Sequence, residues 1–210
     1  ARLQRERFPL IVPNPAIRQP WMPYALAKGE VCYVGEAIAV VVAESRYAAE
    51  DGAGLVAVEY EPLPAAADCR AALEPGAPPA HRETPHNVSA RFTVGFGDVD
   101  TVFGCAPHTF RESLWQHRGS GQALEGRAVL ATHDRTQDLL TVWSATQSPH
   151  SIKRMLVDVL GLDEHQLRVI APDVGGGFGP KGMFYAEEAV VPACAMLLGR
   201  PVKWTEDRWE

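Results

Sequence analysis

The 210-residue sequence predicts a mixed α/β (α+β) fold divided into two domains. Residues 38–42 form an almost wholly apolar run, which is typical of a strand buried on both faces. Residues 62–90 are rich in proline and alanine, as expected of a linker. Residues 167–198 combine a β-branched run, a glycine-rich stretch and an apolar helical run, which indicates a strand, a loop and a helix in that order.

The first domain is predicted to be a strand–helix–strand unit. Its first strand lies within residues 31–44, Ser45 is a suitable N-cap for a helix that runs to Gly54, and residues 55–60 alternate like a second strand. A crossover of this kind is normally right-handed. Residues 1–27 precede the unit, and we expect them to form an extended arm because prolines interrupt any periodicity (Pro9, Pro13, Pro15, Pro20 and Pro23).

The second domain is predicted to begin near residue 85, within the linker. Its expected strands are residues 91–97, 109–115, 128–132, 139–144, 166–171 and 202–205, and its expected helices are residues 148–160 and 186–198. The predicted division is therefore an arm at 1–27, a first domain at 28–84 and a second domain at 85–210. The first residue is not methionine and the last strand runs directly into charged residues, so we expect the chain to be part of a larger protein.

Charge and hydropathy disfavour two classes of partner. The formal net charge is −6, which is opposite to that expected of a nucleic-acid or anionic-membrane surface. No apolar run approaches the roughly 20 residues that span a bilayer. The four cysteines are far apart and the seven histidines are scattered, so spacing predicts no metal ligand. We expect reduced, mostly buried thiols in a cytoplasmic protein (Cys32, Cys69, Cys105 and Cys194).

The glycine-rich loop is the most informative part of the sequence. Five glycines lie between Gly175 and Gly182, after a predicted strand and before a predicted helix. Bare backbone in this setting lets N–H groups approach and bind an anion. A phosphate-binding P-loop is excluded, because Pro180 and Gly182 flank Lys181 where that motif needs glycine and a hydroxyl residue.

A dinucleotide-binding loop stays open as an interpretation. Gly177, Gly179 and Gly182 satisfy G-x-G-x-x-G, and Glu206 follows 24 positions later. This would make the region an NAD-binding, Rossmann-type domain. Pro180 weighs against it by removing one amide donor from the loop.

A second segment, residues 143–150, ends a predicted strand and precedes a helix. Gln147 within it carries an amide that can donate hydrogen bonds to an oxyanion, and it can face the same cleft as the glycine loop. The alternative is that Gln147 and Ser148 only cap the helix. Spacing alone does not decide between these two roles.

Taken together, the sequence resembles the molybdenum-binding large subunit of the xanthine dehydrogenase, aldehyde oxidase and carbon monoxide dehydrogenase family. The similar stretches cover most of residues 28–210 (33–45, 59–64, 146–149, 173–179, 201–204 and 206–208). The resemblance implies an α/β hammerhead domain at 28–84, followed by the first part of the molybdopterin-binding domain at 85–210. It also implies an oxidoreductase that hydroxylates or oxidises a small carbon substrate with water as the oxygen source.

The resemblance further implies the cofactor, the partners and the site. The cofactor would be molybdenum–molybdopterin in its cytosine dinucleotide form, with FAD and 2Fe–2S clusters carried by a medium and a small partner subunit. Gln147 matches the glutamine that approaches an oxygen ligand of molybdenum, and is the implied catalytic residue. The implied cofactor-binding residues belong to the loop (Gly176, Gly177, Phe178 and Gly179). No protein side chain is expected to ligate the metal.

The departures from the family narrow these expectations. Purine-oxidising members carry a glutamate just after the loop lysine, and Gly182 stands there instead, which argues against a purine substrate. The family's general-base glutamate is expected beyond residue 210, so we expect this chain alone to be inactive. A non-catalytic structural or assembly domain of such a complex remains the alternative function, besides the NAD-binding domain.

Overall fold

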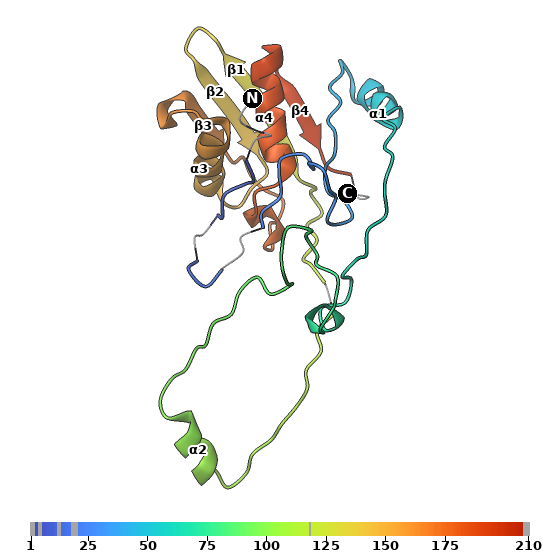
Figure 1. The fold of residues 1–210 in the computed structure, drawn as a ribbon. Helices are drawn as coiled ribbons and strands as arrows, with labels where there is room; N and C mark the ends of the chain where they lie inside the picture. The colour runs from blue at the N-terminus through green and yellow to red at the C-terminus, as the bar shows by residue number, and fades with distance from the viewer. Residues whose placement is uncertain (1–2, 4–5, 12–13, 18–20, 118, 208–210) are drawn as a thin grey trace.

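The computed structural model describes residues 3, 6–11, 14–17, 21–117 and 119–207. Its centre is a four-stranded sheet in the order β3-β2-β1-β4 (Figure 1). The strands are β1 (Ala128–Asp134), β2 (Leu139–Ser144), β3 (Leu167–Ile170) and β4 (Val202–Thr205). β1 pairs antiparallel with both β2 and β4, whereas β2 and β3 are parallel. These four strands were predicted to within two residues at each end.

Two helices pack against each other and against the sheet (Figure 1). α3 (Pro149–Leu160) and α4 (Ala186–Leu198) each end at a glycine with positive φ, at Gly161 and Gly199, as helix C-termini often do. Alternate residues of β1 and β2 face the helices and are almost fully buried, as a half-covered sheet requires. The resulting core contains residues from every one of these elements (Val129, Ala131, Leu140, Val142, Ile152, Met155, Leu156, Leu167, Ala189, Val190, Val191, Ala195 and Val202).

The parallel pair β2–β3 positions the functional segments. Trp143 near the end of β2 lies opposite Ile170 at the end of β3. Because parallel strands end at the same edge of a sheet, the segments that follow them emerge side by side. These segments are residues 145–148 and the glycine-rich loop.

The N-terminal half contains the predicted helix but not the predicted strands. Ser45 is the N-cap of α1 (Arg46–Gly54), and its Oγ accepts the Ala48 N–H at 3.2 Å. A Cβ on Gly52 would lie 2.9 Å from Val41, so α1 packs closely against the preceding extended segment. Residues 31–44 and 55–60, however, form no strand. Their pattern predicts extended chain, but a strand also needs a partner for its N–H and C=O groups, and the described chain offers none.

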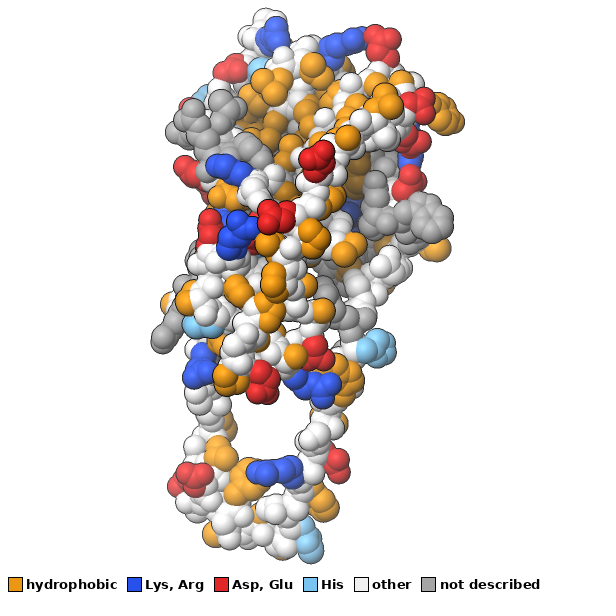
Figure 2. Space-filling view, turned by 45° about the vertical axis from the view of Figure 1, so that its right-hand side comes forward, with side chains coloured by type: hydrophobic (Ala, Val, Ile, Leu, Met, Phe, Trp, Pro, Cys, Tyr) orange, Lys and Arg blue, Asp and Glu red, His pale blue; other side chains and the backbone are white. Residues whose placement is uncertain are grey.

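Residues 91–117 make a long excursion away from the sheet, with α2 (Val99–Cys105) at its tip (Figure 1). The strands predicted at 91–97 and 109–115 are not formed either. The apolar side chains of the two segments are exposed (Phe92, Val94, Phe96, Phe110, Leu114 and Trp115). Figure 2 shows the excursion as an open ring. These strands are missing for the same reason as those predicted at 31–44 and 55–60, because the described chain places no partner strand beside them.

The segment predicted to be an extended arm contributes to the core beside the sheet. Phe8 and Ala25 are buried, and the Phe8 ring contacts Phe184 edge-on at a centroid distance of 5.0 Å. The predicted arm residues Pro13 and Pro20 lie outside the described residues. Within the linker, a short 3-10 helix, η1 (Ala71–Leu73), is formed.

Among the described residues, no helix is long and apolar enough to cross a membrane.

Candidate functional site

The end of β2 is joined to the glycine-rich loop by two hydrogen bonds to one carbonyl. The buried Thr146 hydroxyl donates to the Lys181 carbonyl at 2.9 Å, and the Gln147 N–H donates to the same oxygen at 3.1 Å. The parallel strands bring the two segments together, and these bonds fix their relative position. The juxtaposition expected from the sequence is therefore present.

The side chain of Gln147 points toward the backbone of the glycine-rich loop. Its Oε1 accepts the Gly179 N–H at 3.1 Å, which orients the amide and leaves Nε2 with no acceptor among the described residues. A Cβ on Gly177 would lie 2.4 Å from this Oε1, so only glycine permits the approach. The capping alternative does not fit, because Ser148 is the N-cap of α3 without a side-chain capping bond, and its hydroxyl donates to Ser151.

Two successive backbone donors of the loop have no hydrogen-bond acceptor among the described residues. The N–H of Gly175 donates to the Glu125 carboxylate at 2.8 Å, and that of Gly176 to the Val174 carbonyl at 2.9 Å. Those of Gly177 and Phe178, in contrast, have no acceptor in the described part of the chain. Two successive N–H groups in an irregular loop form a concave surface that binds anions.

Phe178 adopts a strained conformation at the loop's outer surface. Its φ is 53°, which is rare for a bulky residue and costs of the order of 1 kcal/mol. A Cβ on Gly176 would lie 2.6 Å from the Phe178 ring, and one on Gly121 would lie 2.8 Å from the Phe178 Cβ. Two glycines therefore make room for this residue, yet its side chain is 74% exposed. Strain retained at an exposed aromatic residue is typical of a binding site.

Lys181 of the glycine-rich loop forms an ion pair with Glu125, which no sequence pattern predicted. The buried Lys181 Nζ lies 2.5 Å from Glu125 Oε2, the oxygen that also accepts the Gly175 N–H. The Lys181 ammonium, and then the Gly175 N–H, lower the pKa of Glu125. The two residues are 56 positions apart, so no local sequence pattern could predict that they pair.

The first turn of α4 contains two carboxylates with different surroundings. Glu187 pairs with the Arg127 guanidinium. Glu188 is buried, and it accepts the Ser144 hydroxyl at 2.8 Å and the Tyr185 N–H at 3.0 Å. Burial raises the pKa of Glu188 to about 7.

The topology does not match a dinucleotide-binding unit. Gly182 lies in the 3-10 turn η3 (Pro180–Gly182), and α4 begins only at Ala186. α4 leads to β4 at the opposite edge of the sheet, whereas the fingerprint requires a helix leading to the strand next to β3.

Comparison with known proteins agrees with this geometry. Residues 80–210 match the family model of the molybdopterin cofactor-binding domain, and residues 12–64 match that of the aldehyde oxidase and xanthine dehydrogenase a/b hammerhead domain. The chain is 44% identical over 185 residues to the nicotine 6-hydroxylase large subunit of Paenarthrobacter nicotinovorans. That alignment covers 88% of this chain and 22% of the relative.

Two further proteins are similar to the chain. The carbon monoxide dehydrogenase large chain of Afipia carboxidovorans is 36% identical over 198 residues, covering 88% of this chain and 24% of the relative. The crystal structure of quinoline 2-oxidoreductase from Pseudomonas putida 86 superposes with a TM-score of 0.82 at 37% identity, over 91% of this chain and 25% of that one. The chain thus spans about a quarter or less of the length of these relatives. It belongs to the molybdopterin-binding large-subunit family of xanthine dehydrogenase, aldehyde oxidase and carbon monoxide dehydrogenase.

Proposed function

We propose that the chain is the cofactor-facing part of a molybdenum hydroxylase, an oxidoreductase that hydroxylates or oxidises a small carbon substrate. The overall reaction takes an oxygen atom from water and releases two electrons and two protons. The observation that carries the proposal is the convergence of Gln147 and the glycine-rich loop at one sheet edge. The three relatives reported above, whose names denote a hydroxylase, a dehydrogenase and an oxidoreductase, support the reaction class.

The residues at the sheet edge fit an anionic, oxygen-rich cofactor. The N–H groups of Gly177 and Phe178 have no acceptor among the described residues, and the Gln147 Nε2 has none there either. Three donors with no intramolecular acceptor in one small region are suited to phosphate, pterin or metal-oxo oxygens. When bound, the molybdenum cofactor supplies the two-electron redox chemistry.

Each site residue then has a distinct proposed role. Gln147 donates a hydrogen bond from Nε2 to a cofactor oxygen, as the catalytic residue of this chain. Gly176, Gly177 and Gly179 keep the backbone close to the cofactor. Phe178 binds beside it, and its exposed ring shapes the substrate cleft.

We propose the same domain division as the sequence indicated: an arm at 1–27, the hammerhead domain at 28–84, and the N-terminal part of the molybdopterin-binding domain at 85–210. The exposed apolar side chains at 91–117 support a partner that covers them, which we propose is the remainder of the large subunit. In the full assembly, FAD-binding and 2Fe–2S subunits would carry the electrons away. The proposed cofactor is the cytosine dinucleotide form and the proposed location is the cytoplasm.

The proposed substrate is not a purine, because Gly182 replaces the glutamate that the family's purine-oxidising members carry. Nicotine and quinoline are named for two relatives and carbon monoxide for a third. These three compounds are therefore the first to assay with the full-length enzyme.

The alternative is a non-catalytic assembly domain, and cofactor analysis separates it from the enzyme. The full-length protein, expressed with molybdenum and pterin supply, should contain about one molybdenum and one pterin per large subunit. It should also reduce an artificial electron acceptor with one of the substrates above. A folded protein that contains neither molybdenum nor pterin would overturn the proposed function.

A further inference from the structure

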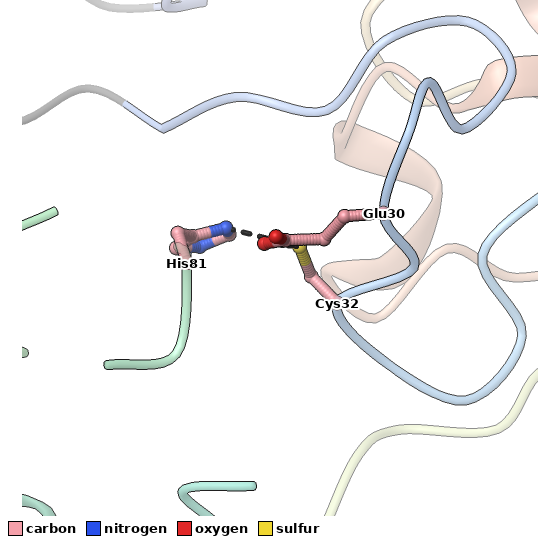
Figure 3. Close-up of side chains that lie close together, drawn as sticks. All are labelled: Glu30, Cys32 and His81. Carbon is pink, nitrogen blue, oxygen red and sulfur yellow. Dashed lines mark hydrogen bonds between the residues drawn. The ribbon is translucent and has the colours of Figure 1, made fainter. Parts of the chain in front are cut away.

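Glu30, Cys32 and His81 form a cluster of metal-binding side chains far from the glycine-rich loop in sequence (Figure 3). Cys32 Sγ lies 3.2 Å from Glu30 Oε1 and 3.2 Å from His81 Nδ1. The three ligand atoms all lie within 4.8 Å of one another. Close sequence spacing predicts no metal ligand here, because Cys32 and His81 are 49 residues apart.

These separations suit a tetrahedral zinc site. With zinc–sulfur and zinc–nitrogen bonds of about 2.3 and 2.0 Å, two neighbouring ligands of a tetrahedron lie about 3.5 Å apart. The two measured separations of 3.2 Å are close to this value, so small side-chain rotations would open space for an ion. Thiolate, imidazole and carboxylate are each donor types that bind zinc.

Both the ring and the backbone of His81 have supporting contacts. It stacks on Trp21 with an interplanar angle of 18° and a centroid distance of 5.6 Å. The His81 carbonyl accepts the N–H and the hydroxyl of the buried Thr84, at 2.9 and 2.8 Å. A ligand fixed in this way loses little entropy when a metal binds.

The two other ligands also have supporting contacts. Glu30 Oε1 accepts the Arg82 N–H at 3.1 Å, and the Cys32 N–H donates to Glu36 at 2.6 Å. Such outer contacts orient metal ligands in known sites. The carboxylates of Glu30 and Glu36, both beside Cys32, supply negative charge that favours a divalent cation here.

We propose that Glu30, Cys32 and His81 bind Zn²⁺, with the fourth position open to water or a further ligand. The cysteine thiolate and the carboxylate together balance the charge of the ion. The site would link the segment at 30–36 to the turn at 81–84, and so stabilise a region that has few strand hydrogen bonds. The proposal is independent of molybdenum, because it uses neither the glycine-rich loop nor Gln147.

The first test uses the full-length protein after removal of metals with a chelator. Zn²⁺ titrated against a chromogenic competitor should bind with a Kd below about 10⁻⁶ M. Co²⁺ in its place should give a thiolate charge-transfer band in the near ultraviolet. Cys32→Ser should abolish this band and weaken zinc binding about 100-fold or more, and His81→Gln should weaken it similarly. The matched control Cys194→Ser, on α4 and outside the cluster, should leave both unchanged.

A second measurement needs no variant and so does not depend on whether a variant folds. Zn²⁺ should slow alkylation of Cys32, located by peptide mapping, while the exposed Cys69 should react at the same rate with or without the ion. Two results would overturn the proposal: zinc binding that Cys32→Ser leaves unchanged, or equal Cys32 alkylation with and without zinc. The latter result would mean that the three side chains form only a hydrogen-bonded cluster.

Discussion

Gln147 Oε1 accepts a hydrogen bond from the Gly179 N–H at 3.1 Å, across 32 residues of sequence. This bond fixes which end of the amide faces the loop, so the Nε2 donor is directed away from Gly179. The orientation follows from two adjacent parallel strands whose C-terminal ends meet at one edge. A single hydrogen bond between two loops therefore links the fold to the proposed chemistry.

The approach of Gln147 to the loop predicts a contrast between two glycine substitutions. A Cβ at Gly177 would lie 2.4 Å from Oε1 of Gln147, whereas one at Gly182 would meet that amide at 3.5 Å, an ordinary contact. Gly177→Ala should displace the flexible amide at little cost in stability but lower the molybdenum content or kcat about 10-fold or more. Gly182→Ala is the matched control for the molybdenum content, which it should retain. Equal losses of molybdenum in the two variants would contradict the proposed role of Gln147.

The ion pair beneath the loop predicts unequal effects of its two partners. The Lys181 side chain is 3% exposed and that of Glu125 is 41% exposed. Glu125→Ala leaves a buried ammonium without its carboxylate and should lower the free energy of unfolding by roughly 3 kcal/mol. Lys181→Met leaves a carboxylate that water can reach and should cost about 1 kcal/mol. Urea unfolding of both variants checks the order, and a larger loss in Lys181→Met would refute the argument.

Glu188 predicts a pH dependence of stability. The folded pKa of about 7 lies above the ordinary value of 4.5, so between these values the folded state holds more protons than the unfolded state. The stability due to protonated Glu188 is therefore present below about pH 4.5 and lost as pH rises to 7. Glu188→Gln should remove this loss and gain up to roughly 3 kcal/mol relative to the parent protein at alkaline pH.

The measurement is urea unfolding of the parent and Glu188→Gln at several pH values. Glutamine can still accept the Tyr185 N–H, and the Ser144 hydroxyl can rotate to accept from its amide. Asp158→Asn, at an exposed position of α3, is the control and should leave the pH dependence of the free energy of unfolding unchanged. Parallel pH profiles for the parent and Glu188→Gln would show that burial of Glu188 has no such effect.

Arg127 predicts that lysine cannot replace arginine where β1 meets α4. Its guanidinium pairs with Glu187, donates to Glu206 at 2.8 Å and stacks on the Tyr185 ring at 4.0 Å. Lysine keeps the charge but lacks the planar fork, so Arg127→Lys should lower the free energy of unfolding by roughly 2 kcal/mol. Arg168→Lys, at an exposed position of β3, should change it little. Similar values for the two variants would disprove the importance of this network.

Residues 128–205 were largely predictable because their signals are local. Ile152, Met155 and Leu156 share one helix face, Gly161 and Gly199 stop their helices, and the four strands predicted in this range have partners within it. The pairing of Gln147 with the loop could also be expected, because both follow predicted strands. The relative position of Gln147 and the loop then followed from the parallel register of β2 and β3.

The remaining features depend on contacts that sequence patterns do not encode. The strands predicted at 31–44, 91–97 and 109–115 have suitable apolar residues but no partner strand in the described chain. The Lys181–Glu125 pair and the Cys32–His81 contact join residues about 50 positions apart, so no spacing rule applies. Arg208, part of a stretch that resembles the family, lies outside the described residues.

The most direct test of the central claim is a crystal structure of the full-length protein loaded with cofactor. We predict that the Gln147 Nε2 lies within about 3 Å of a cofactor oxygen. The N–H groups of Gly177 and Phe178 should face the same cofactor. A molybdopterin bound elsewhere, with the Gln147 amide and the glycine-rich loop facing only solvent, would contradict the account.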